Sequence, residues 1–212
     1  MTKFIDVTLP FSADLPCWPG DPVAEIELIS STADGGSCNV TKISTHVHYG
    51  TRVDAPVHFV PGGKGADQLT LETLIGPAEV ACFETEDKIT AADLDGLALP
   101  AGTKRLLLKT RNSALWDLPT HPFERDYVAF TPDASEWVVA NGIDLVGIDY
   151  LSIERFDEPG HATHHILLGK EVVVIEGLDL RQVEAGSYHL ICLPMKLKDA
   201  DGAFARVVLQ RE

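Results

Sequence analysis

Between His48 and Phe59 the chain places two imidazoles, a carboxylate and a guanidinium among apolar and turn-forming residues. The titratable side chains of this segment belong to His48, Arg52, Asp54 and His58. Such a concentration of charge beside apolar neighbours is costly unless a metal ion or a substrate makes use of it. The segment therefore predicts a site for chemistry.

A second group of candidate ligands lies in the last third of the chain. Histidines stand at His161, His164 and His165, and the apolar run 172–175 ends at Glu176. A carboxylate at the end of such a strand needs a partner. Neutral imidazole nitrogens, anionic oxygens and an open position for water are what Zn²⁺ and Mn²⁺ sites require. Together the two segments indicate a metal site.

Each histidine taken alone has a simpler interpretation, because His161 or His165 is more typical of a surface or capping residue than of a ligand. A whole set of titratable side chains beside apolar runs is harder to explain in that way. We therefore interpret the following residues as one functional set: His48, Asp54, His58, His164 and Glu176.

The elements that must position these residues are mostly strands. β-branched or alternating apolar segments, bounded by turn residues, predict strands at 4–9, 24–30, 40–48, 78–84, 105–110, 127–130, 145–148, 172–176, 187–196 and 203–210. Capping and proline signals predict helices at 70–74, 90–94 and 131–142, and proline-rich loops at 10–22 and 111–126. Strands outnumber helices without alternating with them, which favours a mixed α/β or α+β core.

The local geometry of the first segment also follows from its pattern. Residues two apart in a strand share a face, so His46 and His48 are expected to point the same way. A turn or bulge is expected at residues 50–51. A proline two residues after Asp54 fixes the following backbone, which predicts that Asp54 and His58 lie on a stiff loop facing the histidine strand.

Composition limits the function classes. The 212 residues, 45% hydrophobic and 23% charged, are typical of a single globular domain over 1–212. We expect a cytoplasmic protein without a membrane span, since the chain has neither a long apolar run nor a signal-like N-terminus. A net charge of -15 disfavours nucleic acid as a partner. Four scattered cysteines predict reduced, mostly buried thiols.

The run that begins at His48 resembles the H-x-G-T-H-x-D-x-P-x-H motif of the cyclase family of metal-dependent hydrolases, which includes bacterial kynurenine formamidases and isatin hydrolase. Four further segments resemble family motifs: 18–21 the W-P-G-D loop, 146–152 the G-x-D-x-x-S segment, 164–168 the H-x-x-L-L element and 176–178 the E-G/N-L element. The resemblance therefore covers most of the chain.

This resemblance implies a mixed, strand-rich α/β fold of the swivelling β/β/α type, and a homodimer or homotetramer that acts on a small molecule. It also implies a centre of one or two Zn²⁺ or Mn²⁺ ions that hydrolyses an amide bond. Carried over residue by residue, it makes His48 a ligand of the first metal, Asp54 a bridging carboxylate, His164 a ligand of the second metal, Glu176 a ligand near both, His58 the catalytic acid/base and Trp18 a substrate-stacking aromatic.

The chain departs from the family motif at Arg52, where the family has a histidine that binds the first metal. A guanidinium offers only hydrogen-bond donors and repels a cation. Three outcomes are open. His46 could supply the missing nitrogen, the centre could be repurposed for binding alone, or Arg52 could replace one ion while Asp54, His164 and Glu176 hold the other. We favour the last, in which Arg52 pairs with a carboxylate or holds a substrate oxyanion.

The favoured function is thus hydrolysis of the amide C–N bond of a small aromatic substrate, such as an N-formyl or cyclic amide. The same centre could instead hydrolyse a lactone or catalyse a cyclisation, because fold and metal do not fix the substrate. A non-catalytic protein that binds small molecules is the alternative from another class.

Overall fold

Most strands of the protein belong to one sheet that closes on itself. The computed structural model describes residues 3–83, 87–118 and 122–211. The strands of this sheet are β1 (Lys3–Asp6), β4 (Arg52–Asp54), β5 (Ile75–Phe83), β6 (Arg105–Thr110), β7 (Leu145–Ile148), β8 (Val173–Glu176), β9 (Gly186–Pro194) and β10 (Gly202–Arg211). In the order β10-β4-β8-β7-β6-β5-β9 the ring closes because β9 also pairs with β10, while β1 lies beside the end of β10.

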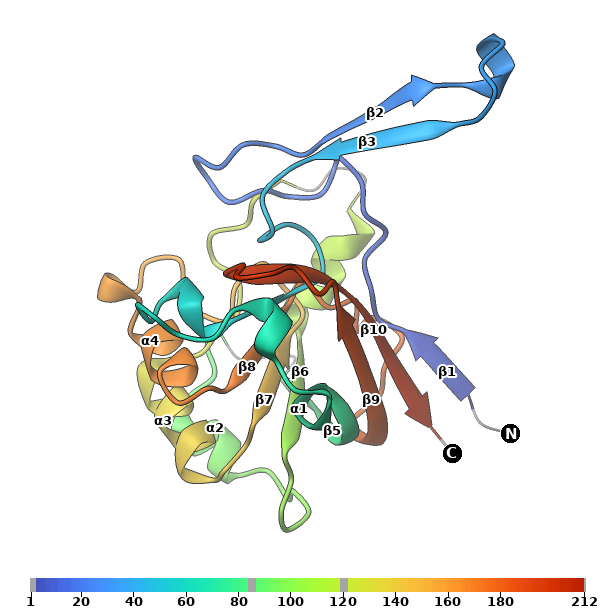
Figure 1. The fold of residues 1–212 in the computed structure, drawn as a ribbon. Coiled ribbons are helices and arrows are strands. Elements are labelled where there is room, and N and C mark those ends of the chain that lie inside the picture. The colour runs from blue at the N-terminus through green and yellow to red at the C-terminus, as the bar shows by residue number, and fades with distance from the viewer. Residues whose placement is uncertain (1–2, 84–86, 119–121, 212) are drawn as a thin grey trace.

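The helices lie outside this ring. They are α1 (Leu71–Leu74), α2 (Ala91–Asp95), α3 (Pro132–Ala140) and α4 (Ala162–Leu168), with short 3₁₀ turns at Thr32–Asp34, Pro56–His58, Ala66–Gln68, Arg111–Asp117 and Pro159–His161. The pairs β5–β6, β6–β7 and β7–β8 are parallel, and parallel neighbours require crossover connections. Helices α2, α3 and α4 lie in these three crossovers and pack side by side on one face (Figure 1). None of the described helices has the length and apolar run needed to span a bilayer.

Apolar side chains fill the inside of the ring. Val53 of β4, Leu107 of β6, Ile175 of β8 and Leu190 of β9 are fully buried in one cluster. Because successive side chains of a strand point to opposite faces, the neighbours of Val53 in β4 must point out of the ring. The outer face of β4, next to α4, is therefore the place where polar residues of this strand gather.

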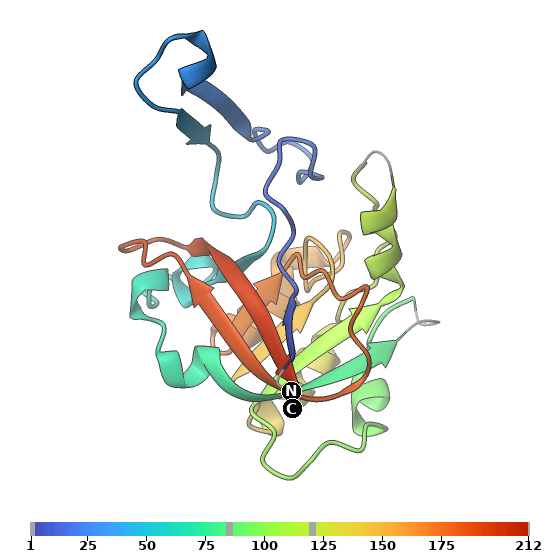
Figure 2. The ribbon, with the colours of Figure 1, turned by 90° about the vertical axis from the view of Figure 1, so that its right-hand side faces the viewer.

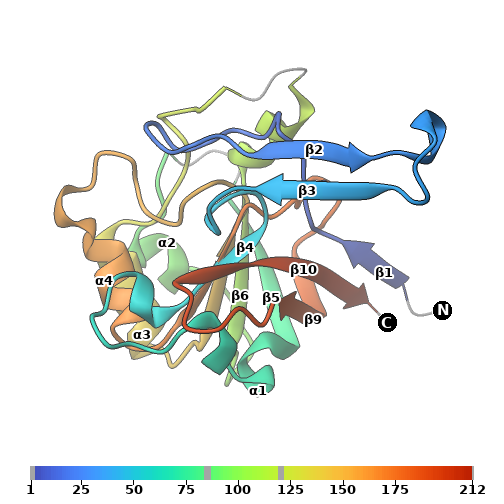
Figure 3. The ribbon, with the colours of Figure 1, turned by 45° about the horizontal axis from the view of Figure 1, so that its top comes forward.

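A separate hairpin projects from the body of the protein. Strands β2 (Glu25–Ser30) and β3 (Val40–Ser44) form this two-stranded arm, which stands away from the closed sheet in Figures 1 and 2. In Figure 3 its two strands lie side by side across the view. Its strands expose large apolar side chains: Ile26, Leu28, Ile29, Val40 and Ile43. An isolated two-stranded hairpin is at best marginally stable in water, and an exposed apolar patch of this kind is typical of an interaction surface.

The predicted helices and most predicted strands are confirmed. Helix α3 begins after Thr131 with Pro132 in its first turn, as the sequence indicates. Helix α2 begins with a capping box, because the Thr90 hydroxyl accepts from the Asp93 amide and the Asp93 carboxylate accepts from the Thr90 amide. Of the predicted elements, residue 84 of the strand 78–84 and residues 119–121 of the loop 111–126 lie outside the described residues.

Two strand predictions are wrong. The strand predicted at 40–48 ends at Ser44, and residues 47–50 form a bend, so His46 and His48 do not share a strand face. Residues 127–130 form no strand, because Phe130 alone makes single bridges to Ile89 and Glu154. At 127–130 the apolar pattern reflects burial in a loop rather than pairing within the sheet.

Helix α4 was not predicted, and part of the loop 111–126 forms a 3₁₀ helix at Arg111–Asp117. The prediction that most of the cysteines are buried is wrong. Cys192 is buried, Cys17 is half-buried, and Cys38 and Cys82 are exposed.

Candidate metal centre

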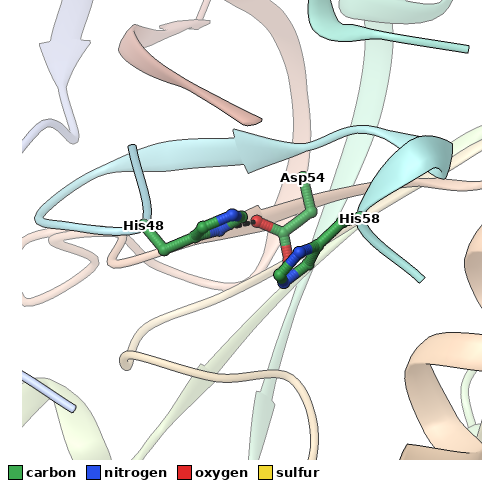
Figure 4. Close-up of side chains that lie close together, drawn as sticks. All are labelled: His48, Asp54 and His58. Atoms are coloured by element: carbon green, nitrogen blue, oxygen red, sulfur yellow. Dashed lines mark hydrogen bonds and ion pairs between the residues drawn. The ribbon is translucent and has the colours of Figure 1, made fainter. Parts of the chain in front are cut away.

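All the predicted site residues line one cavity of about 210 Å³. They come from a loop, a bend, two strands, a 3₁₀ turn and a helix that are far apart in the sequence. The residues are Trp18, His48, Arg52, Asp54, His58, His164 and Glu176. Figure 4 shows three of them, with the rings of His48 and His58 close to the Asp54 carboxylate.

The register of two antiparallel strands brings the central charges together. Arg52 of β4 lies directly opposite Glu176 of β8, and Asp54 follows on the same outer face of β4. Helix α4 packs beside β8 and against the 3₁₀ turn Pro56–His58. These contacts carry His164 and His58 to the end of the two strands.

Three of the predicted ligands converge on one point. The Nε2 atom of His164 lies 3.7 Å from Asp54 Oδ2 and 3.4 Å from Glu176 Oε1, and all three side chains are buried. Asp54 Oδ2 is buried without a hydrogen-bond partner among the described residues. Atoms that bind one tetrahedral ion at the usual bond lengths lie about 3.4 Å apart. The donor set and its spacing therefore fit a divalent metal ion.

The charges of this cluster point to the same conclusion. Burial lowers the pKa of His164, but the facing carboxylates of Glu154, Glu176 and Asp54 outweigh it and raise the pKa to about 10. Burial also raises the pKa of Asp54, yet its contacts with His48 and Arg52 hold that pKa well below its usual range. A cluster that attracts a proton so strongly also attracts a cation, which would displace that proton.

His48 and His58 lie on the other side of Asp54. The Nδ1 atom of His48 is 3.1 Å from Asp54 Oδ1, its Nε2 is 2.8 Å from Asp201 Oδ2, and its ring stacks on His58 at 3.9 Å. Burial lowers the pKa of His48, but the two carboxylates raise it overall. Burial lowers the pKa of His58, and the neighbouring His48 and His164 lower it further. The nearby Asp54 raises this pKa but does not outweigh them. His58 is thus suited to accept a proton near neutral pH.

Arg52 is fixed by the residues around it. Its Nη2 donates to Glu176 Oε2 at 2.6 Å and to the Leu151 carbonyl at 2.5 Å, and its Nη1 donates to the Gly50 carbonyl at 3.2 Å. Its Nε lies 4.0 Å from Asp54 Oδ1. Arg52 thus pairs with the Glu176 carboxylate, while its replacement of a metal ion stays a prediction. The guanidinium stands between Glu176 and the Oδ1 side of Asp54, where it opposes a cation.

His46 does not take the place of the missing histidine. Its Nε2 lies 3.9 Å from Asp21 Oδ2 and 3.8 Å from Cys17 Sγ, in the loop below the arm. The bend at residues 47–50 turns His48 toward Asp54 and leaves His46 outside the cluster. The interpretation in which His46 supplies a metal ligand is therefore wrong for this arrangement.

Aromatic rings form one wall of the cavity. Trp18 lies with its ring centroid 5.1 Å from that of Phe156 and 5.2 Å from that of Phe123. Phe59 stacks on His164 at 4.6 Å with an interplanar angle of 14°. Trp18, Phe59 and Phe156 thus give the cavity an apolar lining beside the charged cluster, which suits a flat substrate.

Sequence reasoning missed two carboxylates at this site. Asp201, just before β10, bonds His48 and lies 3.7 Å from His58 Nδ1. Glu154 is buried, bonds His161 Nδ1 at 2.7 Å and lies 3.4 Å from His164 Nδ1. Nothing in the pattern marked Asp201. Glu154 had one signal, a charged residue directly after the apolar Ile153, two residues beyond the family-like segment 146–152.

Comparison with known proteins decides the lineage. The model of the cyclase family, described as "Putative cyclase", matches residues 5–155. The chain belongs to the cyclase family. This cyclase-family chain is 34% identical to "Cyclase-like protein 1" of Arabidopsis thaliana over 98% of its length and 84% of that protein. It is 32% identical to a "Kynurenine formamidase" of Bacillus anthracis, over 99% of its length and 98% of the relative.

Solved structures agree with this assignment. The structure described as a "Potential Metal-Dependent Hydrolase With Cyclase Activity" matches the whole of both chains with a TM-score of 0.85 and 33% identity. The predicted family and the mixed, strand-rich cyclase-type fold are thereby confirmed. The metal-ligand, acid/base and substrate-stacking roles of individual residues stay predictions.

Proposed function

We propose that this cyclase-family protein is a metal-dependent hydrolase that cleaves the amide C–N bond of a small aromatic substrate. The observation that carries the proposal is the convergence of Asp54 Oδ2, His164 Nε2 and Glu176 Oε1, with the Asp54 oxygen unpartnered, at one end of an aromatic-walled cavity. The hydrolase names of relatives similar over nearly the whole chain support it.

These three residues would hold one Zn²⁺ or Mn²⁺ ion, since a donor set of one imidazole and two carboxylates suits both metals. When bound, such an ion polarises a carbonyl and makes water a better nucleophile near neutral pH. The Arg52 guanidinium would take the place of the first metal of the family, since it already neutralises Glu176 Oε2. We therefore propose a centre with one ion per subunit.

The side chains of the protein supply the remaining chemistry. His58 lines the cavity beside Asp54 with its pKa held low by burial, so its imidazole can take a proton from water and pass it to the leaving nitrogen. Trp18 would orient a flat substrate and exclude water from one side of the cavity.

An activity screen with metal-loaded protein tests this proposal. An aryl formamide such as N-formylkynurenine, a cyclic amide such as isatin and a simple lactone are compared, with metal content measured on the same sample. We expect turnover of an amide, and His58→Ala should lower kcat by at least about a hundredfold while it retains the metal. Turnover of the lactone alone would favour the lactonase alternative, and an unchanged kcat in His58→Ala would remove His58 from the mechanism.

The same proposal includes a homodimer formed through the arm. The exposed apolar residues of β2 and β3 support it, because a two-stranded hairpin needs a surface that covers it. Light scattering of the purified protein should give twice the mass of the chain. The paired substitutions Ile26→Glu and Ile43→Glu should give a monomer. A cytoplasmic location stays a prediction.

A further inference from the structure

Two consecutive residues, Ile153 and Glu154, contact two of the three proposed metal ligands. The amide of Ile153 donates to Glu176 Oε1 at 2.7 Å, and the carboxylate of the next residue, Glu154, faces the Nδ1 atom of His164 at 3.4 Å. Consecutive residues of the chain thus reach both Glu176 and His164 from the side away from Asp54. The segment is placed to set the orientation of both ligands.

The Glu154 carboxylate is itself held firmly. The residue is 2% exposed, its Oε1 accepts from His161 Nδ1 at 2.7 Å, and its Oε2 accepts from the His164 amide at 3.2 Å. The backbone on either side is also fixed, since the Glu154 amide donates to Ser152 Oγ and the Glu154 carbonyl accepts from Tyr127. A carboxylate with this many contacts has little freedom to rotate away from His164.

His164 needs such a partner to act as a ligand. An imidazole binds a metal through an unprotonated nitrogen, and the hydrogen bond made by the other nitrogen decides which nitrogen that is. The Nε2 atom of His164 faces Asp54 and Glu176, whereas its buried Nδ1 has no hydrogen bond among the described residues and faces Glu154. A proton on Nδ1, attracted by Glu154, would leave Nε2 free for the ion.

We propose that Glu154 is a positioning residue that keeps the proton of His164 on Nδ1 and directs Nε2 toward the metal. The inference rests on the proposed function, because it concerns an ion held by Asp54, His164 and Glu176. Glu154 contacts the ligand and not the ion, so its effect is on metal affinity. Loss of a partner of this kind costs about 10- to 100-fold in affinity.

The variant Glu154→Gln tests the proposal, because it keeps the shape and the acceptor oxygen but removes the charge. Metal-free protein is titrated with Zn²⁺ in competition with a coloured chelator, and with Co²⁺ to record the visible spectrum. We expect Zn²⁺ affinity to fall about 10- to 100-fold and the Co²⁺ bands to change. Glu136→Gln, an identical substitution at an exposed position of α3, is the matched control and should bind as the wild type does.

A purely structural role for Glu154 predicts a different result. Its bond to the His164 amide helps to begin helix α4, so the variant could lose stability without losing affinity. Urea unfolding of the metal-free proteins measures that loss separately. An NMR spectrum of the Zn²⁺-loaded wild type should show the His164 proton on Nδ1, and Glu154→Asp should recover part of the lost affinity.

The outcomes separate the inference from the function on which it rests. Wild-type protein that binds one Zn²⁺, with Glu154→Gln binding it within about twofold of the wild type, would overturn the role of Glu154 and leave the proposed centre intact. Wild-type protein that binds no Zn²⁺ would overturn both. A proton found on His164 Nε2 in the Zn²⁺-loaded protein would also overturn the inference.

Discussion

Two buried aspartates of this protein have opposite surroundings. Asp149, at the end of β7, accepts hydrogen bonds from the amide and the hydroxyl of both Thr110 and Ser113. Asp54, at the end of β4, is equally buried, but one of its oxygens has no partner among the described residues and faces a cavity. Both residues lie in segments with family-like motifs, yet only Asp54 has an oxygen left for a ligand.

The difference shows how a buried carboxylate can be assigned a role. The Asp149 carboxylate is hydrogen-bonded to donors of the chain. These bonds hold the start of the 3₁₀ helix Arg111–Asp117 against the sheet. Asp54 shares its charge with His48 and with the cationic Arg52 on one side and leaves the other side open. A saturated carboxylate stabilises the fold, while an open one implies a metal or substrate.

The largest expected effect is the loss of metal binding when Asp54, but not Asp149, is substituted. Asp54→Asn should lower Zn²⁺ affinity more than about a thousandfold, because an anionic ligand is lost, while circular dichroism shows the fold retained. Inductively coupled plasma mass spectrometry of the dialysed protein measures the bound metal. If Asp54→Asn unfolds the protein instead, the contrast between the two residues fails.

Substitution of Asp149 should instead lower the stability of the fold. Asp149→Ala leaves four donors without their acceptor, so the free energy of unfolding should fall by about 2–4 kcal/mol, while metal stoichiometry is unchanged. Urea unfolding of the metal-free protein gives this value. A stable Asp149→Ala protein that no longer binds metal would place Asp149 in the site and contradict its structural role.

A smaller effect is expected at the aromatic wall. Trp18→Ala removes a ring that packs on Phe156 and faces the cavity, so KM should rise about tenfold while kcat changes less. Steady-state kinetics with an aromatic amide measures both. An equal loss with an aliphatic formamide would show that Trp18 anchors the loop rather than the substrate.

The smallest effect concerns pH. Burial raises the pKa of Asp149 to about 6, against the opposing hydrogen bonds from Ser113 and Thr110. Since this pKa exceeds that of the unfolded chain, the folded state binds more protons and stability falls as pH rises toward 6. The contribution is about 1 kcal/mol between pH 5 and pH 6. Asp149→Asn should lack this pH-dependent contribution to the free energy of unfolding. If the free energy of unfolding falls equally with pH in both proteins, the raised pKa of Asp149 is contradicted.

The sequence predicted the chemistry of the site better than its geometry. Types and spacing of residues indicated His48, Asp54, His58, His164 and Glu176, because charge beside apolar runs is visible without a structure. The helix that carries His164 was missed, since α4 is short and its N-cap residue, His161, makes no side-chain cap. Short elements of this kind depend on packing against the rest of the fold more than on local preference.

The sequence could not predict which residues contact one another at the site. The pairing of Arg52 with Glu176 depends on the register of β4 with β8, and the contact of Asp201 with His48 joins residues far apart in the chain. Neither relation has a periodicity or a local signal. The sequence predicted that Arg52 would matter, and the fold shows which carboxylate it neutralises.

The central claim is that Arg52 takes the place of one metal ion and leaves a single ion at Asp54, His164 and Glu176. Metal stoichiometry of the wild type and of Arg52→His, loaded with Zn²⁺ and dialysed under the same conditions, tests it most directly. The account predicts one ion per chain in the wild type and two in Arg52→His, where the new imidazole joins His48 and Asp54. Two ions in the wild type, or none, would contradict it.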